Sequence, residues 1–131
     1  MKYLVDTDIY SYFLRGKFNL IDTFEQKGLQ DIRISRITIA ELEVLAHRNP
    51  ESKINLSAIT SLSTAFGIIE VDRDTWKQFS LLKADILSRG VTRGDFDILN
   101  AAVANQHGMV IVTNNISHYE DIVSVENWIV T

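Results

Sequence analysis

Short apolar runs rich in β-branched residues alternate along this chain with longer segments in which apolar side chains recur at helical spacing. The short runs predict strands at residues 2–5, 32–35, 67–71, 109–112 and, with a weaker pattern, 123–126. An alternation of strands and helices is typical of a parallel sheet with helices on both faces. The pattern therefore predicts an α/β protein of three layers, with a central, mostly parallel sheet of four or five strands.

The helical segments have recognisable ends. Two short helices, interrupted at Gly16, follow the first strand, and Gly28 ends the second because glycine readily adopts the backbone conformation found at helix C-termini. Further helices are predicted at 38–47, 51–65, from Asp72 or Asp74 to Gly90, and at 95–107. No linker, internal repeat or low-complexity stretch interrupts this order. We therefore expect residues 1–131 to form a single domain.

Polar side chains follow the predicted strands at the places where a ligand would bind. In open parallel sheets, ligands bind beyond the carboxyl ends of the strands, where the next helices begin. The residues at these places are mainly acids and amides: Asp6, Asp8, Glu41, Asp95, Asp97, Thr113, Asn114 and Asn115. Since the strands are parallel, we expect these side chains to meet at one edge of the sheet.

Helix capping offers a local explanation for each acid. The first helix can be capped by Asp6, Thr7 or Asp8, whose side chains accept hydrogen bonds from free N–H groups. Three further segments have the spacing of a capping box: 38–41, 92–95 and 117–120. Capping explains each residue singly, but it does not require Asp6, Glu41 and Asp97 to converge from three separate segments.

A convergence of three carboxylates favours a bound cation. Unpaired carboxylates at close quarters repel one another, and at least one of their pKa values rises unless a cation neutralises them. The chain has no cysteine, and its histidines do not stand at ligand spacing; His47 and His107 lie in predicted last turns, and His118 is assigned no catalytic role. Oxygen ligands alone suit Mg²⁺ or Mn²⁺ rather than Zn²⁺. Such a site is typical of a nuclease or another phosphoryl-transfer enzyme.

Net charge restricts how such a site would meet a nucleic acid. With 13 basic and 17 acidic residues the net charge is -4, so contact with phosphates requires a local basic patch or bridging cations. Candidate phosphate contacts near the same edge are Arg15, Lys17, Arg36 and Arg93, with the hydroxyl of Thr113 at the rim.

The distribution of apolar residues bears on localisation. No apolar stretch approaches the roughly 18 residues of a membrane span. Asp6 and Asp8 also interrupt the N-terminus where a signal peptide needs an apolar run. We therefore expect a cytoplasmic protein with no membrane partner.

Four segments in this order resemble the PIN-domain ribonucleases and, among them, the VapC-type toxins of bacterial toxin-antitoxin pairs. The segments are 3–9 (YLVDTDI), 34–42 (ISRITIAEL), 94–102 (GDFDILNAA) and 112–115 (VTNN), the last followed by Tyr119. The resemblance covers nearly the whole chain. It implies that Asp6, Glu41 and Asp97 are catalytic acids that bind metal directly or through water, and that Asn115 orients a water molecule or a phosphate.

The same resemblance implies an activity and partners. It indicates a PIN-like fold and an Mg²⁺- or Mn²⁺-dependent endoribonuclease toxin that forms a homodimer and is inhibited by a cognate VapB-type antitoxin. Two positions depart from the family pattern. Asn115 stands where many members carry a carboxylate, so a second metal would be held more weakly, and Asp95 stands where close relatives often carry a small residue or proline. We interpret Asp95 as a helix cap beside the site.

Two other readings remain open at the level of sequence. Asp6-Thr7-Asp8 after an apolar strand resembles the Asp-x-Asp pair of haloacid-dehalogenase-type phosphohydrolases, although Ile9 and Tyr10 follow where that motif usually has Thr or Val. A non-catalytic, receiver-like interaction domain would share the doubly wound topology. A receiver needs a lysine after a late strand, and residues 113–115 contain none.

Overall fold

Five parallel strands form the central sheet of the computed structural model, which describes residues 2–130. The strands are β1 (Tyr3–Val5), β2 (Ile32–Ser35), β3 (Ile68–Ile69), β4 (Val110–Val112) and β5 (Val125–Glu126), and their order in the sheet is β3-β2-β1-β4-β5. Every neighbouring pair is parallel. All five predicted strands are present, and the two strands at the edges are shorter than the sequence pattern predicts.

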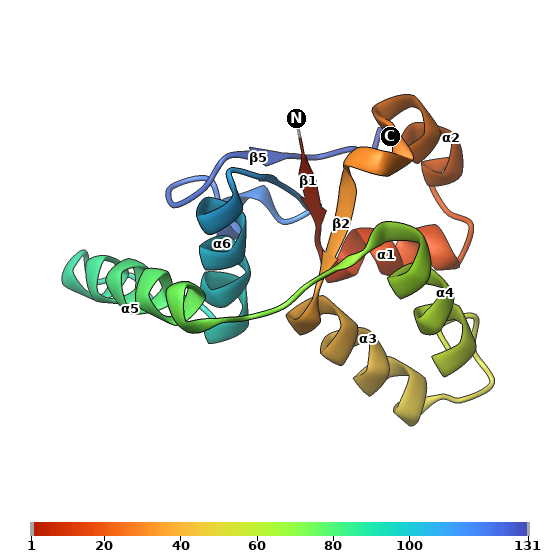
Figure 1. The fold of residues 1–131 in the computed structure, drawn as a ribbon, viewed down its shortest axis with the longest axis horizontal. Coiled ribbons are helices and arrows are strands. Elements are labelled where there is room, and N and C mark those ends of the chain that lie inside the picture. Colours follow the sequence, from red (N-terminus) through yellow and green to blue (C-terminus); the bar gives the residue numbers. More distant parts are fainter. Residues whose placement is uncertain (1, 131) are drawn as a thin grey trace.

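In the part of the chain that the structure describes, six α-helices connect and cover the strands (Figure 1). They are α1 (Thr7–Leu14), α2 (Leu20–Lys27), α3 (Arg36–Arg48), α4 (Leu56–Phe66), α5 (Arg73–Ser88) and α6 (Asp95–His107). Two short 3₁₀ helices, η1 (Leu29–Asp31) and η2 (Ile116–His118), were not predicted. Within residues 2–130, none of the helices is both long enough and apolar enough to span a membrane.

Two hydrophobic cores lie on opposite faces of the sheet. Successive residues of a strand point to opposite faces, so Val5 of β1 packs in one core and Leu4 in the other. The first core joins the sheet to α1–α4 through buried aromatic and aliphatic side chains such as Phe24 and Phe66. The second joins it to α6, whose Ala101 packs closely on the sheet, and to one face of α5. Figure 1 shows α5 and α6 on one side of the strands and α1 and α4 on the other. This arrangement confirms the three-layer α/β/α prediction.

Several predicted helix starts are wrong in detail. The predicted helix at 51–65 begins only at Leu56, because the Asn55 side chain accepts a hydrogen bond from the Ala58 N–H (2.9 Å) and caps the helix there. For α5, the sequence left the cap open between Asp72 and Asp74; Asp72 is the cap, and it forms a capping box with Thr75.

The three proposed capping boxes are also incorrect. Ser35 caps α3 by accepting a hydrogen bond from the Thr38 N–H (3.1 Å), so Glu41 is not part of a box with Thr38. In the segment 92–95 the capping position falls on Gly94, which has no side chain to accept a hydrogen bond. The segment 117–120 lies across the end of η2 and begins no α-helix. Glu41 therefore does not cap α3.

Candidate active site

The carboxyl edge of the sheet carries a cavity of about 300 Å³. The side chains around it are Asp6, Thr7, Asp8, Ser11, Glu41, Leu45, Asp97, Asn115 and His118. They come from the segment after β1, from α3, from the start of α6 and from the loop after β4. Four of these side chains are carboxylates, and neither lysine nor arginine lines the cavity. Asp6, Glu41 and Asp97 converge as predicted. Asp8, for which the sequence did not settle whether it belongs to the site, also lines the cavity.

Asp6 lies at the base of this cavity and is only 8% exposed. It is the N-cap of α1, and its Oδ1 accepts a hydrogen bond from the Thr7 N–H (2.9 Å). Its Oδ2 accepts from the hydroxyls of Thr113 and Tyr119, both at 3.1 Å. The Asn100 amide approaches Oδ1 at 3.4 Å from within α6. Both oxygens of Asp6 are thus held by donors from four different segments.

Asp8, at the start of α1, forms hydrogen bonds with the loop after β4. Its Oδ2 accepts hydrogen bonds from the Asn114 N–H (2.9 Å) and from the Asn115 side-chain amide (3.3 Å). The Ile9 N–H donates to Oδ1 at 2.8 Å. These contacts place the Asn115 side chain on the wall of the cavity.

Glu41 and Asp97 face the cavity from two different helices. Glu41 Oε1 accepts a hydrogen bond from the Thr7 hydroxyl at 2.6 Å, which links α3 to the start of α1. Asp97 Oδ1 accepts from the Tyr119 hydroxyl at 3.0 Å, and Asp97 Oδ2 lies 3.0 Å from Nδ1 of His118. Each carboxylate is therefore oriented by a group on another segment of the chain.

Burial is the main cause of raised pKa values at three of the acids, Asp6, Asp8 and Glu41. Burial, with the nearby charges of Asp8 and Asp97, raises the pKa of Asp6 to about 7, although the Thr7 N–H and Tyr119 hydroxyl oppose the rise. Burial also raises the pKa values of Asp8 and Glu41. The cavity thus holds more negative charge than its surroundings neutralise, which favours the uptake of a proton or a cation.

Two further candidate phosphate contacts, Thr113 and Arg15, are absent from the residues that line the cavity. Thr113 is fully buried beneath the cavity, between Asp6 and Asp8, rather than at the rim. Arg15 ends α1 one turn after Ser11; its guanidinium lies 5.1 Å from the Tyr12 ring centroid, and its Nε donates to the Ser11 carbonyl.

Two of the other charged candidates, Arg93 and Asp95, form ion pairs outside the cavity. Arg93 pairs with Asp121 and lines an adjoining cavity of about 230 Å³ that shares Asp97 and His118 with the acidic one. Lys17 is exposed on the turn after α1. Asp95 does not point into the site and instead pairs with Lys83 of α5.

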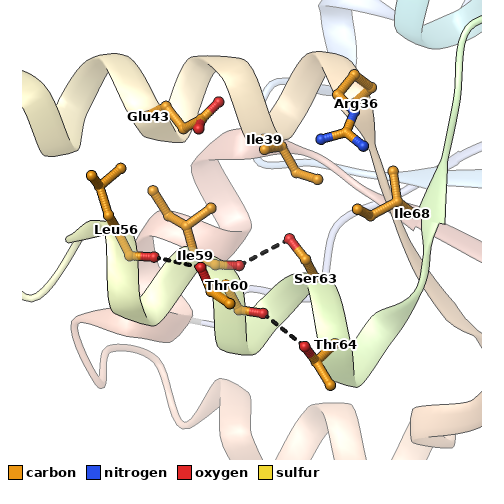
Figure 2. A pocket seen from close by; sticks show the side chains of 9 residues that line it. All are labelled: Arg36, Ile39, Glu43, Leu56, Ile59, Thr60, Ser63, Thr64 and Ile68. Carbon is orange, nitrogen blue, oxygen red and sulfur yellow. Dashed lines mark hydrogen bonds between the residues drawn. The ribbon is translucent and has the colours of Figure 1, made fainter.

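Arg36 lies away from the acidic cavity. It borders a larger cavity of about 490 Å³ between α3 and α4, lined mainly by aliphatic side chains and by Ser and Thr hydroxyls (Figure 2). Several of those hydroxyls donate to carbonyls of their own helix, as Ser63 does to Ile59. Arg36 itself forms a two-pronged ion pair with Glu70. The structure therefore does not place Arg36 where a phosphate at the acidic cavity would meet it.

The groups that orient the acids were not assigned as their partners from the sequence. Tyr119 and Asn100 bring donors to Asp6, Thr7 brings one to Glu41, and His118 contacts Asp97. Among residues 2–130, no three acidic or histidine side chains are already arranged as a metal centre. Donors of the protein contact both oxygens of Asp6 and one oxygen of Glu41.

A known protein family matches most of this chain. The model of the PIN domain matches residues 3–120, which is most of the chain. The chain belongs to the PIN domain family. The resemblance of the four sequence segments is confirmed, and the match to the PIN domain includes every acid that lines the cavity.

Individual relatives of this PIN domain match over nearly their full length. "Ribonuclease VapC2" of Haemophilus influenzae is 27% identical, with 98% of this chain and 99% of the relative covered. The "tRNA(fMet)-specific endonuclease VapC" of Salmonella typhimurium is 24% identical, with 98% of both chains covered. Among solved structures, VapBC2 from Rickettsia felis bound to a DNA fragment from their promoter superposes with a TM-score of 0.83 at 25% identity, covering 98% of this chain and 99% of that one.

Proposed function

We propose that this PIN domain is a metal-dependent endoribonuclease toxin that cleaves phosphodiester bonds in RNA. The observation that carries the proposal is the cavity at the carboxyl edge of the sheet, where Asp6, Asp8, Glu41 and Asp97 meet without a lysine or arginine among them. Two relatives that match nearly the whole chain carry the names of RNA-cleaving enzymes. One is named a ribonuclease and the other a tRNA(fMet)-specific endonuclease. Neither the phosphohydrolase nor the interaction-domain reading accounts for both observations.

The oxygen atoms around the cavity are suitable ligands for Mg²⁺ or Mn²⁺. The chain contains no thiolate, and the cavity offers carboxylate and amide oxygens, which are the ligands that hard divalent cations prefer. A cation also relieves the repulsion that raises the pKa of Asp6. We assign Asp6, Glu41 and Asp97 as the residues that hold the metal. When bound, such a metal supplies charge neutralisation at the scissile phosphate and lowers the pKa of a bound water molecule.

The residues of the chain have separate tasks in this site. Asp6, Glu41 and Asp97 concentrate negative charge at one point, where they would hold a divalent cation that neutralises charge on the phosphate. Asp8 holds the loop after β4, so that the Asn115 amide stays on the cavity wall, where it orients a water molecule or a phosphate oxygen. Thr113 supports Asp6 and Asp8 from below.

The RNA backbone would run past the rim of the acidic cavity. Arg93, which lines the adjoining cavity, and Arg15, which ends α1, are the candidate phosphate contacts. Because Arg93 is paired with Asp121, its contribution depends on exchanging part of that pairing for a phosphate.

The proposed partner is a VapB-type antitoxin that inhibits the nuclease. The structural relative from Rickettsia felis is a VapBC2 complex bound to promoter DNA, which supports such a partner for this chain. We also propose that the chain forms a homodimer and acts in the cytoplasm, where its RNA substrates are found.

The direct test is cleavage of RNA by the purified chain. We expect total cellular RNA to be cut at discrete positions with Mg²⁺ or Mn²⁺, and we expect EDTA to stop the reaction until metal is restored. Sequencing of the new RNA ends identifies the substrate. Full cleavage in EDTA, or intact RNA under every metal condition, would contradict the proposal.

Asn115→Asp tests whether the loop after β4 belongs to the metal site. The substitution places a carboxylate oxygen where an amide now donates to Asp8 at 3.3 Å, so the metal-free protein should melt at a lower temperature. The added charge should also lower the Mg²⁺ concentration for half-maximal cleavage, by roughly tenfold, because ligand charge controls affinity for hard cations. Metal titration and thermal unfolding in EDTA measure the two effects.

Asn114→Asp is the matched control for this prediction. It adds the same charge one residue away, on a side chain whose Oδ1 accepts a hydrogen bond from Asn127 rather than facing Asp8. If Asn115→Asp changes neither quantity more than Asn114→Asp does, then Asn115 lies outside the metal site.

A further inference from the structure

We propose that Tyr119 is a positioning residue that holds the carboxylates of Asp6 and Asp97 in the orientation needed to bind a divalent cation. The inference rests on the proposed function in taking these acids as metal ligands. Its basis is the position of a single buried hydroxyl, which lies 3.1 Å from Asp6 Oδ2 and 3.0 Å from Asp97 Oδ1. Within the described residues 2–130, this hydroxyl is the group that contacts both acids.

The fold fixes the position of this hydroxyl. Tyr119 is fully buried, and its ring packs in the core that joins the sheet to α6. Its N–H donates to the Ile116 carbonyl at 2.9 Å, and its carbonyl accepts from the N–H groups of Ile122 and Val123. The ring therefore has little freedom to follow a carboxylate that moves, and the carboxylates must adapt to the hydroxyl.

The hydroxyl links two acids that lie far apart in the sequence. Asp6 follows β1, whereas Asp97 lies in the first turn of α6, more than ninety residues later in the sequence. On the far side of Asp97, His118 contacts the second carboxylate oxygen at 3.0 Å. Two consecutive residues at the end of η2 thus fix both oxygens of Asp97 and, through Tyr119, its placement relative to Asp6.

A tyrosine hydroxyl suits this positioning role. A tyrosine hydroxyl has one hydrogen, so it can donate to only one of the two carboxylates at a time, while its lone pairs remain close to the other. A donor between two ligands keeps their oxygens oriented without neutralising either charge. Groups that orient metal ligands in this way typically change metal affinity by about 10- to 100-fold when they are removed.

The test compares Tyr119→Phe with Tyr10→Phe. Tyr119→Phe removes one oxygen and keeps the ring in the core. Tyr10 is an equally buried tyrosine whose hydroxyl donates to the Arg33 carbonyl at 2.9 Å, away from the acids, so Tyr10→Phe reports the loss of a buried hydrogen bond alone. Direct binding of Mn²⁺ to each purified protein, without RNA, is measured by calorimetry.

We expect Tyr119→Phe to bind Mn²⁺ about 10- to 100-fold more weakly than the parent, and Tyr10→Phe to bind it with unchanged affinity. In RNA cleavage, Tyr119→Phe should need correspondingly more Mn²⁺ for half-maximal rate, with an unchanged KM for RNA. Equal or tighter Mn²⁺ binding by Tyr119→Phe, the same loss in both variants, or no Mn²⁺ binding by the parent would overturn the proposal. A parent that binds Mn²⁺ but leaves RNA intact would instead refute the nuclease function, while the binding comparison would still decide the role of Tyr119.

Discussion

Asp97→Asn is expected to reduce RNA cleavage by roughly a thousandfold or more, because it removes one of the three carboxylates that we propose hold the metal. Asp97 comes from the first turn of α6 and faces Glu41 and Asp6 across the acidic cavity. Its loss leaves a site with one charge fewer to hold a divalent cation. The measurement is the single-turnover rate of cleavage at several Mg²⁺ concentrations, with RNA fragments resolved by gel.

The substitution should leave the surrounding structure intact. An asparagine at position 97 can still accept a hydrogen bond from the Tyr119 hydroxyl through its carbonyl oxygen, and its amide can donate to His118 where Asp97 now lies 3.0 Å away. It also removes a charge that contributes to the raised pKa of Asp6. We therefore expect the melting temperature in EDTA to be equal to that of the parent or higher.

Asp95→Asn is the matched control on the same turn of the same helix. Asp95 pairs with Lys83 and does not line the cavity, so its replacement removes the same charge two residues away without touching the site. Full activity of Asp95→Asn together with loss of activity in Asp97→Asn separates a role at the metal from a general effect of charge on α6. Equal activity of Asp97→Asn and the parent would remove Asp97 from the catalytic site.

The placement of the acids could be predicted from sequence because it follows from topology. Once β1, β2 and β4 are recognised as parallel, the residues after them must lie at one edge of the sheet, and this brings Asp6, Glu41 and Asn115 together whatever the side-chain details. The long helix 95–107 was predicted with its observed bounds because glycines flank it. These inferences depend on local pattern and on the order of the elements.

Contacts between distant segments could not be predicted in the same way. Ser35 and Thr38 both have the residue type of a helix cap, and the sequence alone does not show that the helix begins at Arg36. Arg36 was expected at the site, yet its partner Glu70 approaches only because β3 pairs with β2. The position of the Tyr119 hydroxyl depends on the 3₁₀ turn before it, which has no clear periodicity. Side-chain partners of this kind follow from the assembled fold.

Raising the pH should destabilise the metal-free protein through Asp6. The pKa of this carboxyl is about 7 in the folded state, against 3.8 for an ordinary aspartate, because burial and the charges of Asp8 and Asp97 disfavour its anion. Between these two values the folded state binds more protons than the unfolded state, so the free energy of unfolding falls as the pH rises. A shift of about three units corresponds to roughly 4 kcal/mol at most. The fall ends above about pH 7, where Asp6 is ionised in both states.

Thermal unfolding in EDTA between pH 5 and 8 measures this effect, with Asp6→Asn as the comparison. The parent should lose about 5–10 °C in melting temperature between pH 5.5 and 7.5 beyond any change in Asp6→Asn, which has no proton to lose at this position. The variant can keep the local hydrogen bonds, because its amide can donate to Thr113 and Tyr119, whose hydroxyls can then donate to Asp8 and Asp97. Saturating Mg²⁺ should reduce the pH dependence of the parent, since the cation competes with the proton for the same carboxylate. Parallel pH profiles for the two proteins in EDTA would show that Asp6 is already ionised at pH 5 in the folded chain, and that the donors around it outweigh its burial.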